Sequence, residues 1–308
     1  MRWTLADMPD QTGRTVLVTG ATSGLGLHSA TALAAAGARV LITARQPERG
    51  EAALEHVRRE GGPAVELVAL DLADLASVRR AAADVRERTG DALHVLMTNA
   101  GVMSTPPSTT VDGFELQIGT NHLGHAALTW LLMPALRNGG AARVVTVSSL
   151  AHTGGGLDVD DLHFRHRPYV AGRAYSQSKL ANLLFAAELD RRLRAAGDDV
   201  ISVAAHPGFA RTELLANSMR RYNPLLAMIS IPINRIFSQD VTRGMLPQLY
   251  AATAPEVRGG DYYGPGGLAE LAGWPAPARR SPPARDADLA RRLWMVTAAQ
   301  TGVQPDPP

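Results

Sequence analysis

The feature that most constrains the fold is an alternation of short apolar runs with longer alanine-rich segments along most of the chain. The short runs are rich in β-branched residues and apolar throughout, which is typical of parallel strands buried on both faces. Strands are predicted over 15–19, 40–43, 65–70, 95–98, 143–147 and 200–204. Helices are predicted over 25–36, 47–60, 75–88, 116–136 and 175–195. This order predicts a doubly wound α/β fold with right-handed crossovers and a parallel sheet of about seven strands.

The alternation occurs once, and we expect a single domain over residues 1–308. Three segments lie outside it: a polar loop over His152–Arg173, an insert from about Glu213 to Gln239, and a Gly/Pro-rich tail from Gly259 with a final helix near Asp286–Gln300. Ligands of doubly wound folds bind beyond the carboxyl ends of the strands. The loop and the insert both follow strand ends, so we expect both to shape a pocket.

Composition excludes several kinds of protein. The 31 basic residues are 30 arginines and one lysine, Lys179, against 29 acidic residues. The arginines are interleaved with acids, which indicates solvated helix faces and no nucleic-acid partner, despite a pI of about 9.2. A GxxxxGK[ST] phosphate loop is excluded, because Lys179 does not follow such a glycine pattern. The lack of cysteine excludes disulfides, thiolate metal sites and cysteine nucleophiles.

No apolar run approaches the roughly 20 residues that a membrane span needs. The longest, 225–236, is broken by Pro232 and Asn234, and the N-terminal residues lack the apolar core of a secretory signal. We therefore expect a cytoplasmic protein without a membrane span. The apolar segment 222–237 has three readings: a flap that favours a lipophilic carbonyl or alcohol, a core helix, or a peripheral membrane contact.

A glycine-rich loop, TGATSGLG at 19–26, joins the first predicted strand to the first helix. Gly20 permits a tight turn, Gly24 lets the backbone approach a pyrophosphate, and Gly26 lets the helix pack on the strand. The phosphates would then sit at the positive end of the helix. The loop predicts a dinucleotide site of the Rossmann type, formed here by Gly20, Ser23, Gly24, Leu25 and Gly26.

The ends of the next strands bear on which dinucleotide binds. Thr43-Ala44-Arg45 lacks the carboxylate that would bind the ribose 2′-OH of NAD, whereas Arg45 can pair with a 2′-phosphate, so we predict NADP(H) over NAD(H). Asp71, followed by Leu72, either accepts a hydrogen bond from the adenine amino group or caps a helix. The small residues of Asn99-Ala100-Gly101 leave room for adenosine.

Tyr175 and the lone Lys179 stand four residues apart and share one face of a predicted helix. A tyrosine of pKa about 10 is a poor base at neutral pH, and a nearby cation favours tyrosinate. The pair can exchange a proton with a substrate oxygen while a hydride moves between carbon and a nicotinamide. A GC-rich genome explains why lysine is scarce but not why this one remains. Its retention suggests that position 179 needs an ammonium.

With these residues the sequence resembles the short-chain dehydrogenase/reductase family over nearly its whole length. The motifs occur in the family's order: TGxxxGxG at 19–26, NAG at 99–101, a serine pair at 148–149, YxxxK at 175–179 and PG at 207–208. The segments 120–129, 148–152 and 174–189 are similar to the retinol dehydrogenase-like branch.

The resemblance implies catalytic roles. Tyr175 would be the general acid/base, and Lys179 would hold the nicotinamide ribose and depress the tyrosine pKa. Ser149 would donate a hydrogen bond to the substrate oxygen, and the choice of Ser149 over Ser148 rests on the resemblance. Asn121 would position a water for a proton relay.

The resemblance also implies that the nicotinamide is bordered by Pro207, Gly208 and Thr212. Two features depart from the family pattern. Thr98 replaces an asparagine, which we expect to alter strand packing more than chemistry. Ser149 and Tyr175 are separated by 26 positions, more than in most of the family, which bears on pocket shape.

The sequence thus predicts an NADP(H)-dependent oxidoreductase that interconverts a carbonyl and an alcohol on a small lipophilic substrate. Two other readings stay open: an epimerase or dehydratase that uses the same tyrosine, and a non-catalytic nucleotide-sensing regulator. The pairs His122/His125 and His163/His166 have metal-like spacing without acidic or cysteine partners, so we predict polar helix or loop histidines and no metal site. A homo-oligomer is left open.

Overall fold

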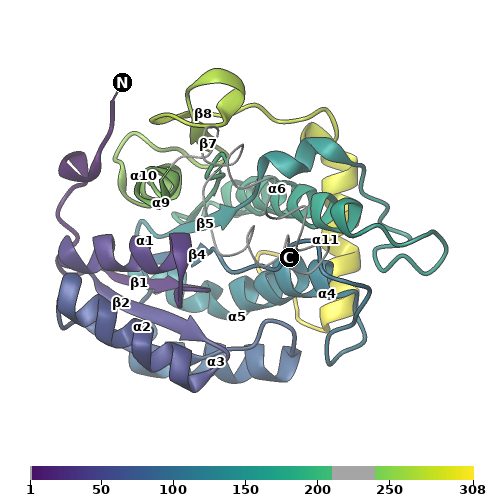
Figure 1. Ribbon diagram of the computed structural model, residues 1–308. Coiled ribbons are helices and arrows are strands. Elements are labelled where there is room, and N and C mark those ends of the chain that lie inside the picture. The colour runs from purple at the N-terminus through teal and green to yellow at the C-terminus, as the bar shows by residue number, and fades with distance from the viewer. Residues whose placement is uncertain (1, 210–239) are drawn as a thin grey trace, which may run out of the picture.

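The computed structural model describes residues 2–209 and 240–308. Within them eight strands form one sheet, in the order β3-β2-β1-β4-β5-β6-β7-β8 (Figure 1). The strands are β1 (Thr15–Val18), β2 (Arg39–Ala44), β3 (Val65–Ala69), β4 (Val95–Thr98), β5 (Arg143–Val147), β6 (Ile201–Ala205), β7 (Tyr262–Pro265) and β8 (Pro275–Pro277). The strand order reverses direction between β1 and β4, so the predicted doubly wound α/β fold is confirmed.

The sheet has one strand more than predicted, and that strand is not parallel. β8 pairs with β7 in antiparallel orientation, whereas all other neighbours are parallel. The connection over 266–274 is too short for a parallel crossover, which needs a dozen or more residues. Both strands contain proline, and β7 also glycine, which hides them from a pattern based on β-branched residues.

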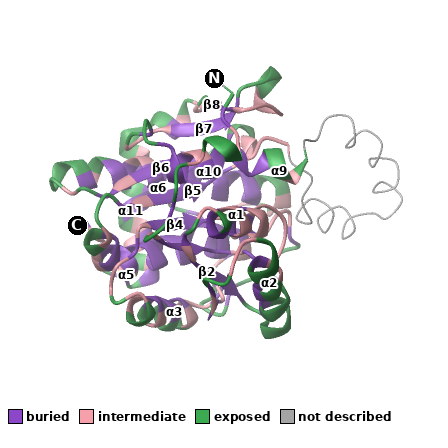
Figure 2. Cartoon of the chain, turned by 90° about the vertical axis from the view of Figure 1, so that its left-hand side faces the viewer, coloured by how far each residue is buried: buried purple, intermediate pink, exposed green. Residues whose placement is uncertain are grey.

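Helices cover both faces of the sheet. They are α1 (Gly24–Ala35), α2 (Pro47–Glu60), α3 (Leu75–Arg88), α4 (Leu116–Ile118), α5 (Gly124–Gly139), α6 (Ala171–Ala195), α9 (Val241–Gly244), α10 (Leu246–Thr253) and α11 (Ala287–Thr301). Side chains alternate along each strand, so Val16 and Val18 pack with α1, α2 and α10, whereas Leu17 packs with α3, α5 and α6. Figure 2 shows the buried strands between helices whose outer turns are exposed.

The predicted helix 116–136 is interrupted. Between α4 and α5 the residues Gly119–Leu123 form a π-helix, a rare widened turn that often marks functional sites. Asn121, one of the predicted site residues, lies in this turn. The periodicity of apolar residues continues through it, so the sequence pattern carries no sign of the change.

The final helix α11 lies against α6 and α5, outside the layer that they form (Figure 1). Its Trp294 is buried against Trp130 and Phe185. Among the described helices, none combines the length and the apolar character that crossing a membrane requires. The predicted insert 213–239 lies outside the described residues.

Candidate active site

A cleft of about 750 Å³ opens where the parallel strands end. Its walls come from the residues that end or follow six strands of the sheet, β1 to β6, as expected for a doubly wound fold. Fifteen of the predicted cofactor positions line it: Gly20, Ser23, Gly24, Leu25, Gly26, Arg45, Asp71, Leu72, Asn99, Ala100, Gly101, Tyr175, Lys179, Pro207 and Gly208. Thr212 lies outside the described residues.

The glycine-rich loop has the conformation that its sequence predicts. Gly20 has φ +66° and Gly24 has φ +55°, a region that side chains disfavour. A Cβ on Gly26 would lie 2.4 Å from the Gly20 carbonyl oxygen, so only glycine lets α1 approach the loop this closely. Helix α1 begins at Gly24, and its first N–H groups therefore face the cleft as an anion site.

Asn99 has a second role that the sequence analysis did not anticipate. Its side-chain amide donates to the Thr19 carbonyl over 2.9 Å, which ties the end of β4 to the glycine-rich loop. The Thr19 hydroxyl accepts the N–H groups of Asn99 and Ala100, each over 3.0 Å. The side chain of Asn99 thus shapes the floor of the cleft.

Three side chains line the predicted adenosine end of the cleft. Arg45 is exposed at its rim, and Arg49, in the first turn of α2, also lines it. Asp71 accepts the N–H of Ala73 over 2.9 Å and so forms a turn, while Asp74 is the residue that caps α3. The capping alternative for Asp71 is therefore wrong in detail, although its carboxylate still lines the cleft.

The structure distinguishes the two serines that end β5. The Ser148 hydroxyl donates to the Lys179 carbonyl over 2.8 Å and is turned into α6. The Ser149 hydroxyl bonds to the phenol of Tyr175 and accepts the N–H of Ala151 over 3.2 Å. Ser149 is therefore the serine that accompanies the tyrosine, as the resemblance implied.

Tyr175 and Lys179 are both buried in the first three turns of α6. The Lys179 Nζ lies 5.9 Å from the centre of the Tyr175 ring and donates to the Val147 carbonyl over 3.1 Å. The chain thus brings phenol, ammonium and the Ser149 hydroxyl together at one wall of the cleft.

The expected lowering of the tyrosine pKa is wrong for the protein alone. Burial raises the pKa of Tyr175 to about 12, and the hydrogen bond with Ser149 opposes this only in part. Burial also lowers the pKa of Lys179 to about 8. A buried phenolate and a buried ammonium both lose hydration, and here that loss outweighs the effect of a cation almost 6 Å from the ring.

Asn121 lies behind the cleft wall rather than in it. Its Oδ1 accepts the Val102 N–H over 2.8 Å, and its Nδ2 donates to the Val102 carbonyl and the Ser178 hydroxyl, each over 2.9 Å. A Cβ on Gly101 would lie 3.1 Å from the Asn121 Oδ1 and 3.6 Å from the Lys179 Nζ, so both side chains approach Gly101. The water relay through Asn121 stays a prediction.

The sequence analysis missed His125 as a site residue. This histidine is buried, and its Nδ1 lies 3.0 Å from the Asn121 carbonyl while its Nε2 lies 2.9 Å from the Thr19 hydroxyl. It links the π-helix to the glycine-rich loop. His122 is also buried and bonds to Thr297 of α11, so both are helix histidines with polar partners inside the protein. Across the described residues, no group of three His, Cys, Asp or Glu side chains is arranged to hold a metal.

Gln117 was missed as well. Its Oε1 accepts the Ser104 N–H over 2.8 Å, and its Nε2 donates to the Tyr169 hydroxyl over 2.9 Å and the Ala171 carbonyl over 3.0 Å. It thereby fixes the cleft-lining segment 102–105 to the start of α6. A buried glutamine in a helical pattern has no sequence signal that separates it from an exposed one.

Comparisons with known proteins agree with this geometry. The family model described as short chain dehydrogenase matches residues 14–223, about two thirds of the chain. The chain belongs to the short-chain dehydrogenase family. Human retinol dehydrogenase 13 is 40% identical over 95% of this chain and 86% of its own length.

Solved structures of family members agree as well. A crystal structure of an uncharacterized protein from Mycobacterium paratuberculosis has a TM-score of 0.82 and 43% identity, and covers 99% of each chain. A structure titled Pseudomonas aeruginosa RhlG/NADP active-site complex has a TM-score of 0.63 and 26% identity, and covers 82% of this chain and 94% of that one.

The chain is therefore an NAD(P)-dependent oxidoreductase of the short-chain dehydrogenase family, similar to retinol dehydrogenases. Its cleft fits the family's cofactor on structural grounds: Gly20, Gly24 and Gly26 line it with backbone and no side chain, and α1 begins there at Gly24. The family match argues against the non-catalytic and epimerase readings.

Proposed function

We propose that this protein reduces a lipophilic aldehyde or ketone with NADPH, and oxidises the corresponding alcohol in reverse, with Tyr175 as the general acid/base. The observation that carries the proposal is the buried Tyr175 phenol, bonded to Ser149 and one helical turn from Lys179, in the cleft that the glycine-rich loop lines.

The preference for NADP(H) is supported by charge at the end of β2. The cleft there is lined by Thr43, Ala44, Arg45 and Gln46, with no carboxylate among them, and by Arg49 on the same side. Guanidinium groups pair with a phosphate through two hydrogen bonds, whereas a ribose hydroxyl calls for an acceptor. A solved relative is titled as an NADP complex, which supports the same choice.

The lipophilic substrate is supported by apolar residues in the same cleft. Side chains that cannot hydrogen-bond contribute to its lining, and such surface favours a ligand with little polar area. They are Val102, Met103, Leu150, Ala151 and Phe209. A relative at 40% identity is named for retinol, a lipophilic alcohol. A cytoplasmic location and the absence of a nucleic-acid partner belong to the same proposal.

The chemistry follows from the pKa of the tyrosine. When bound, the reduced nicotinamide supplies the hydride that the carbonyl carbon receives. Tyr175, whose pKa of about 12 keeps it protonated at neutral pH, gives its proton to the carbonyl oxygen. Ser149 donates a hydrogen bond to that oxygen as negative charge develops. The ammonium of Lys179 then favours the tyrosinate that remains until it is reprotonated.

The test is NADPH oxidation with a panel of lipophilic aldehydes and ketones, comparing the wild type with Tyr175→Phe. Loss of the positioned acid should lower kcat by roughly 10²- to 10⁴-fold. Tyr250→Phe is the matched control, because its phenol donates to Glu256 and is not part of the cleft lining. Turnover that survives Tyr175→Phe would refute the mechanism.

A second experiment tests the cofactor preference. Arg45→Asp should weaken NADPH binding by roughly 10- to 100-fold, since a charge-assisted hydrogen bond contributes about 1.5–3 kcal/mol. It should leave NADH binding unchanged or stronger. Fluorescence titration of both nucleotides measures this. An unchanged NADPH affinity would contradict the role of Arg45 in binding the 2′-phosphate.

A further inference from the structure

Beside the predicted nicotinamide contact lies a histidine that the mechanism does not use. His206 follows the last residue of β6 and precedes Pro207 and Gly208. Its side chain is fully buried, although its neighbours line the cleft. The ring lies against β7, where a Cβ on Gly264 would come 1.9 Å from its Nε2. Figure 2 shows β6, β7 and β8 side by side at this edge of the sheet.

Both ring nitrogens of His206 are engaged. The Gly208 N–H donates to Nδ1 over 3.1 Å, so Nδ1 carries no proton. The proton is therefore on Nε2, which lies 3.0 Å from Glu270 Oε2 and donates to it. Burial lowers the pKa of His206 to about 4, so the ring is neutral at physiological pH with this one tautomer. Its orientation is thereby determined from both sides.

Glu270 connects this histidine to the segment between β7 and β8. Its other oxygen, Oε1, accepts the Arg279 N–H over 3.0 Å. Glu270 and the preceding Ala269 have φ +57° and +51°, a conformation that residues with a Cβ rarely adopt. Left-handed backbone at non-glycine residues persists where surrounding contacts hold it, and here the carboxylate is held at both oxygens.

The turn after His206 is tied to the same segment. Gly208 has φ +66°, and a Cβ there would lie 2.5 Å from the Leu271 carbonyl oxygen. The Phe209 N–H donates to that same carbonyl over 2.8 Å. Pro207 has no N–H, and the N–H groups of Gly208 and Phe209 are bonded to His206 and Leu271, so this turn directs no backbone donor into the cleft.

We propose that His206 and Glu270 are positioning residues for the cofactor: together they hold Pro207–Gly208 in the shape that meets the nicotinamide end of the dinucleotide. The role rests on the proposed function, because Pro207 and Gly208 are assigned there by the family motif. It gives the β7–β8 segment, which carries no family motif identified in the sequence, a part in cofactor binding. Loss of the link leaves the fold intact and loosens the turn.

The experiment measures dissociation constants for NADPH and NADH by fluorescence titration, with kcat and KM for NADPH alongside. His206→Ala and Glu270→Ala should each weaken the binding of the preferred nucleotide by roughly five- to tenfold, the effect of one or two lost hydrogen bonds. KM should rise with the dissociation constant, while kcat changes less. His206→Asn should recover affinity over His206→Ala, because an asparagine side chain accepts the N–H two residues ahead.

His94→Ala is the matched control. That histidine also accepts a backbone N–H at Nδ1, from Thr15 over 2.9 Å. It precedes β4, however, and so lies at the opposite end of the strands from the cleft. Its loss should lower the melting temperature without changing nucleotide affinity. Deuterium exchange without nucleotide should rise at Gly208 and Phe209 in His206→Ala but not in His94→Ala.

The outcomes separate this inference from the proposed function. If the wild type binds neither nucleotide, the proposed function fails and this role fails with it. If the wild type binds NADPH and both His206→Ala and Glu270→Ala stay within twofold of it, this inference alone is overturned. Should His206→Ala not fold, Glu270→Ala decides, because its side chain is partly exposed in a surface segment.

Discussion

At the scale of single residues, burial sets the protonation of the catalytic pair. Tyr175 and Lys179 lie in the same low-dielectric wall, and burial favours the neutral form of each. It raises the pKa of Tyr175 to about 12 and lowers the pKa of Lys179 to about 8. The tyrosine is thereby prepared to give a proton, while the lysine keeps its charge only below about pH 8. The pH range of the enzyme then depends on the lysine.

We expect the NADPH-dependent reduction to decline as the pH rises through about 8, because Lys179 loses its proton there. In Lys179→Arg the charge persists, but a planar fork replaces a compact ammonium, so most activity should be lost while the fold survives. A pH profile of kcat/KM from pH 6 to 10, with circular dichroism of the variant, measures both. Near-normal turnover of Lys179→Arg would show that position 179 does not need an ammonium, and codon usage would then suffice to explain the lone lysine.

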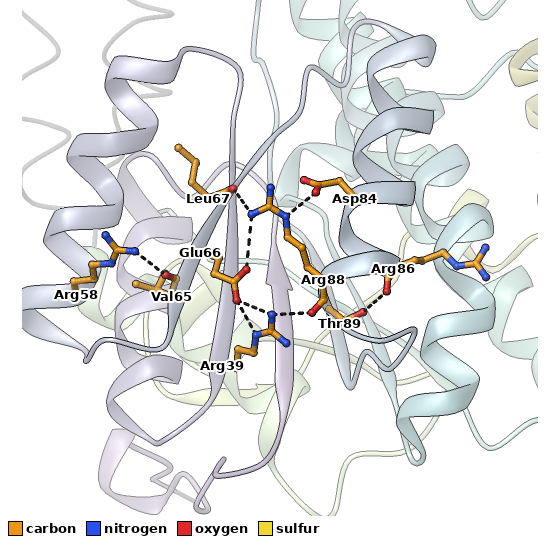
Figure 3. Close-up of polar contacts among 9 residues, drawn as sticks. All are labelled: Arg39, Arg58, Val65, Glu66, Leu67, Asp84, Arg86, Arg88 and Thr89. Atoms are coloured by element: carbon orange, nitrogen blue, oxygen red, sulfur yellow. Dashed lines mark hydrogen bonds and ion pairs between the residues drawn. The ribbon is translucent and has the colours of Figure 1, made fainter.

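At the scale of elements, the edge strand β3 is covered by arginines. Figure 3 shows Arg58 from α2 reaching the Val65 carbonyl and Arg88 from α3 reaching the Leu67 carbonyl, over 3.4 and 3.3 Å. The carbonyl that precedes Val65 points the other way, toward β2, since the Ala64 oxygen accepts the Val40 N–H. The arginines therefore bind carbonyls on the free edge of the sheet, which could otherwise pair with another chain.

Glu66 lies between the guanidinium groups of Arg39 and Arg88 in Figure 3. It pairs with Arg39 at 2.6 Å and with Arg88 at 3.8 Å, while Arg88 also pairs with Asp84 at 2.6 Å. Exposed ion pairs contribute about 0–1 kcal/mol each to stability. The network is thus more important for keeping the arginines over the edge than for holding the fold together.

We predict that replacing Arg58 and Arg88 by serine increases aggregation on mild heating, with little change in the free energy of unfolding, about 1–2 kcal/mol. The matched control replaces Arg59 and Arg80 instead, which lie on the same helices and pair with Glu60 and Asp74. Both doubles remove the same charge, so light scattering compares only the edge contacts. Equal aggregation of the two doubles would argue against edge protection.

At the scale of the whole molecule, three buried histidines couple folding to acid. Burial lowers the pKa of His122 to about 3, and of His125 and His206 to about 4. In the unfolded chain each binds a proton below about pH 6.5. Between these values the unfolded chain holds more protons, so stability falls as the pH falls.

Each histidine should cost about 1.4 kcal/mol of unfolding free energy per pH unit between about pH 6 and 4. Denaturant unfolding at several pH values measures this slope. His122→Gln should make it shallower by the share of one proton, whatever its effect on stability at pH 7. A slope that His122→Gln leaves unchanged would contradict this assignment.

The parts of this protein that local pattern encodes were predictable. Strands β1 to β6 and most helix boundaries follow from the period of apolar residues, and α2, α3, β4 and β5 have the predicted bounds. The glycine-rich loop and the Tyr175–Lys179 spacing lie within single segments, so their geometry follows from one turn or one helix. Prediction failed where proline and glycine interrupt the period, as in β7 and β8.

By itself, the sequence determined the doubly wound order of elements, the dinucleotide loop and the identity of the tyrosine–lysine pair. Only the tertiary structure decided that Ser149 rather than Ser148 meets the tyrosine, that burial raises the pKa of Tyr175, and that His206 is held by Glu270, 64 residues away. The physical reason is that desolvation and long-range hydrogen bonds depend on which distant segments close around a side chain. No spacing within a single segment records that.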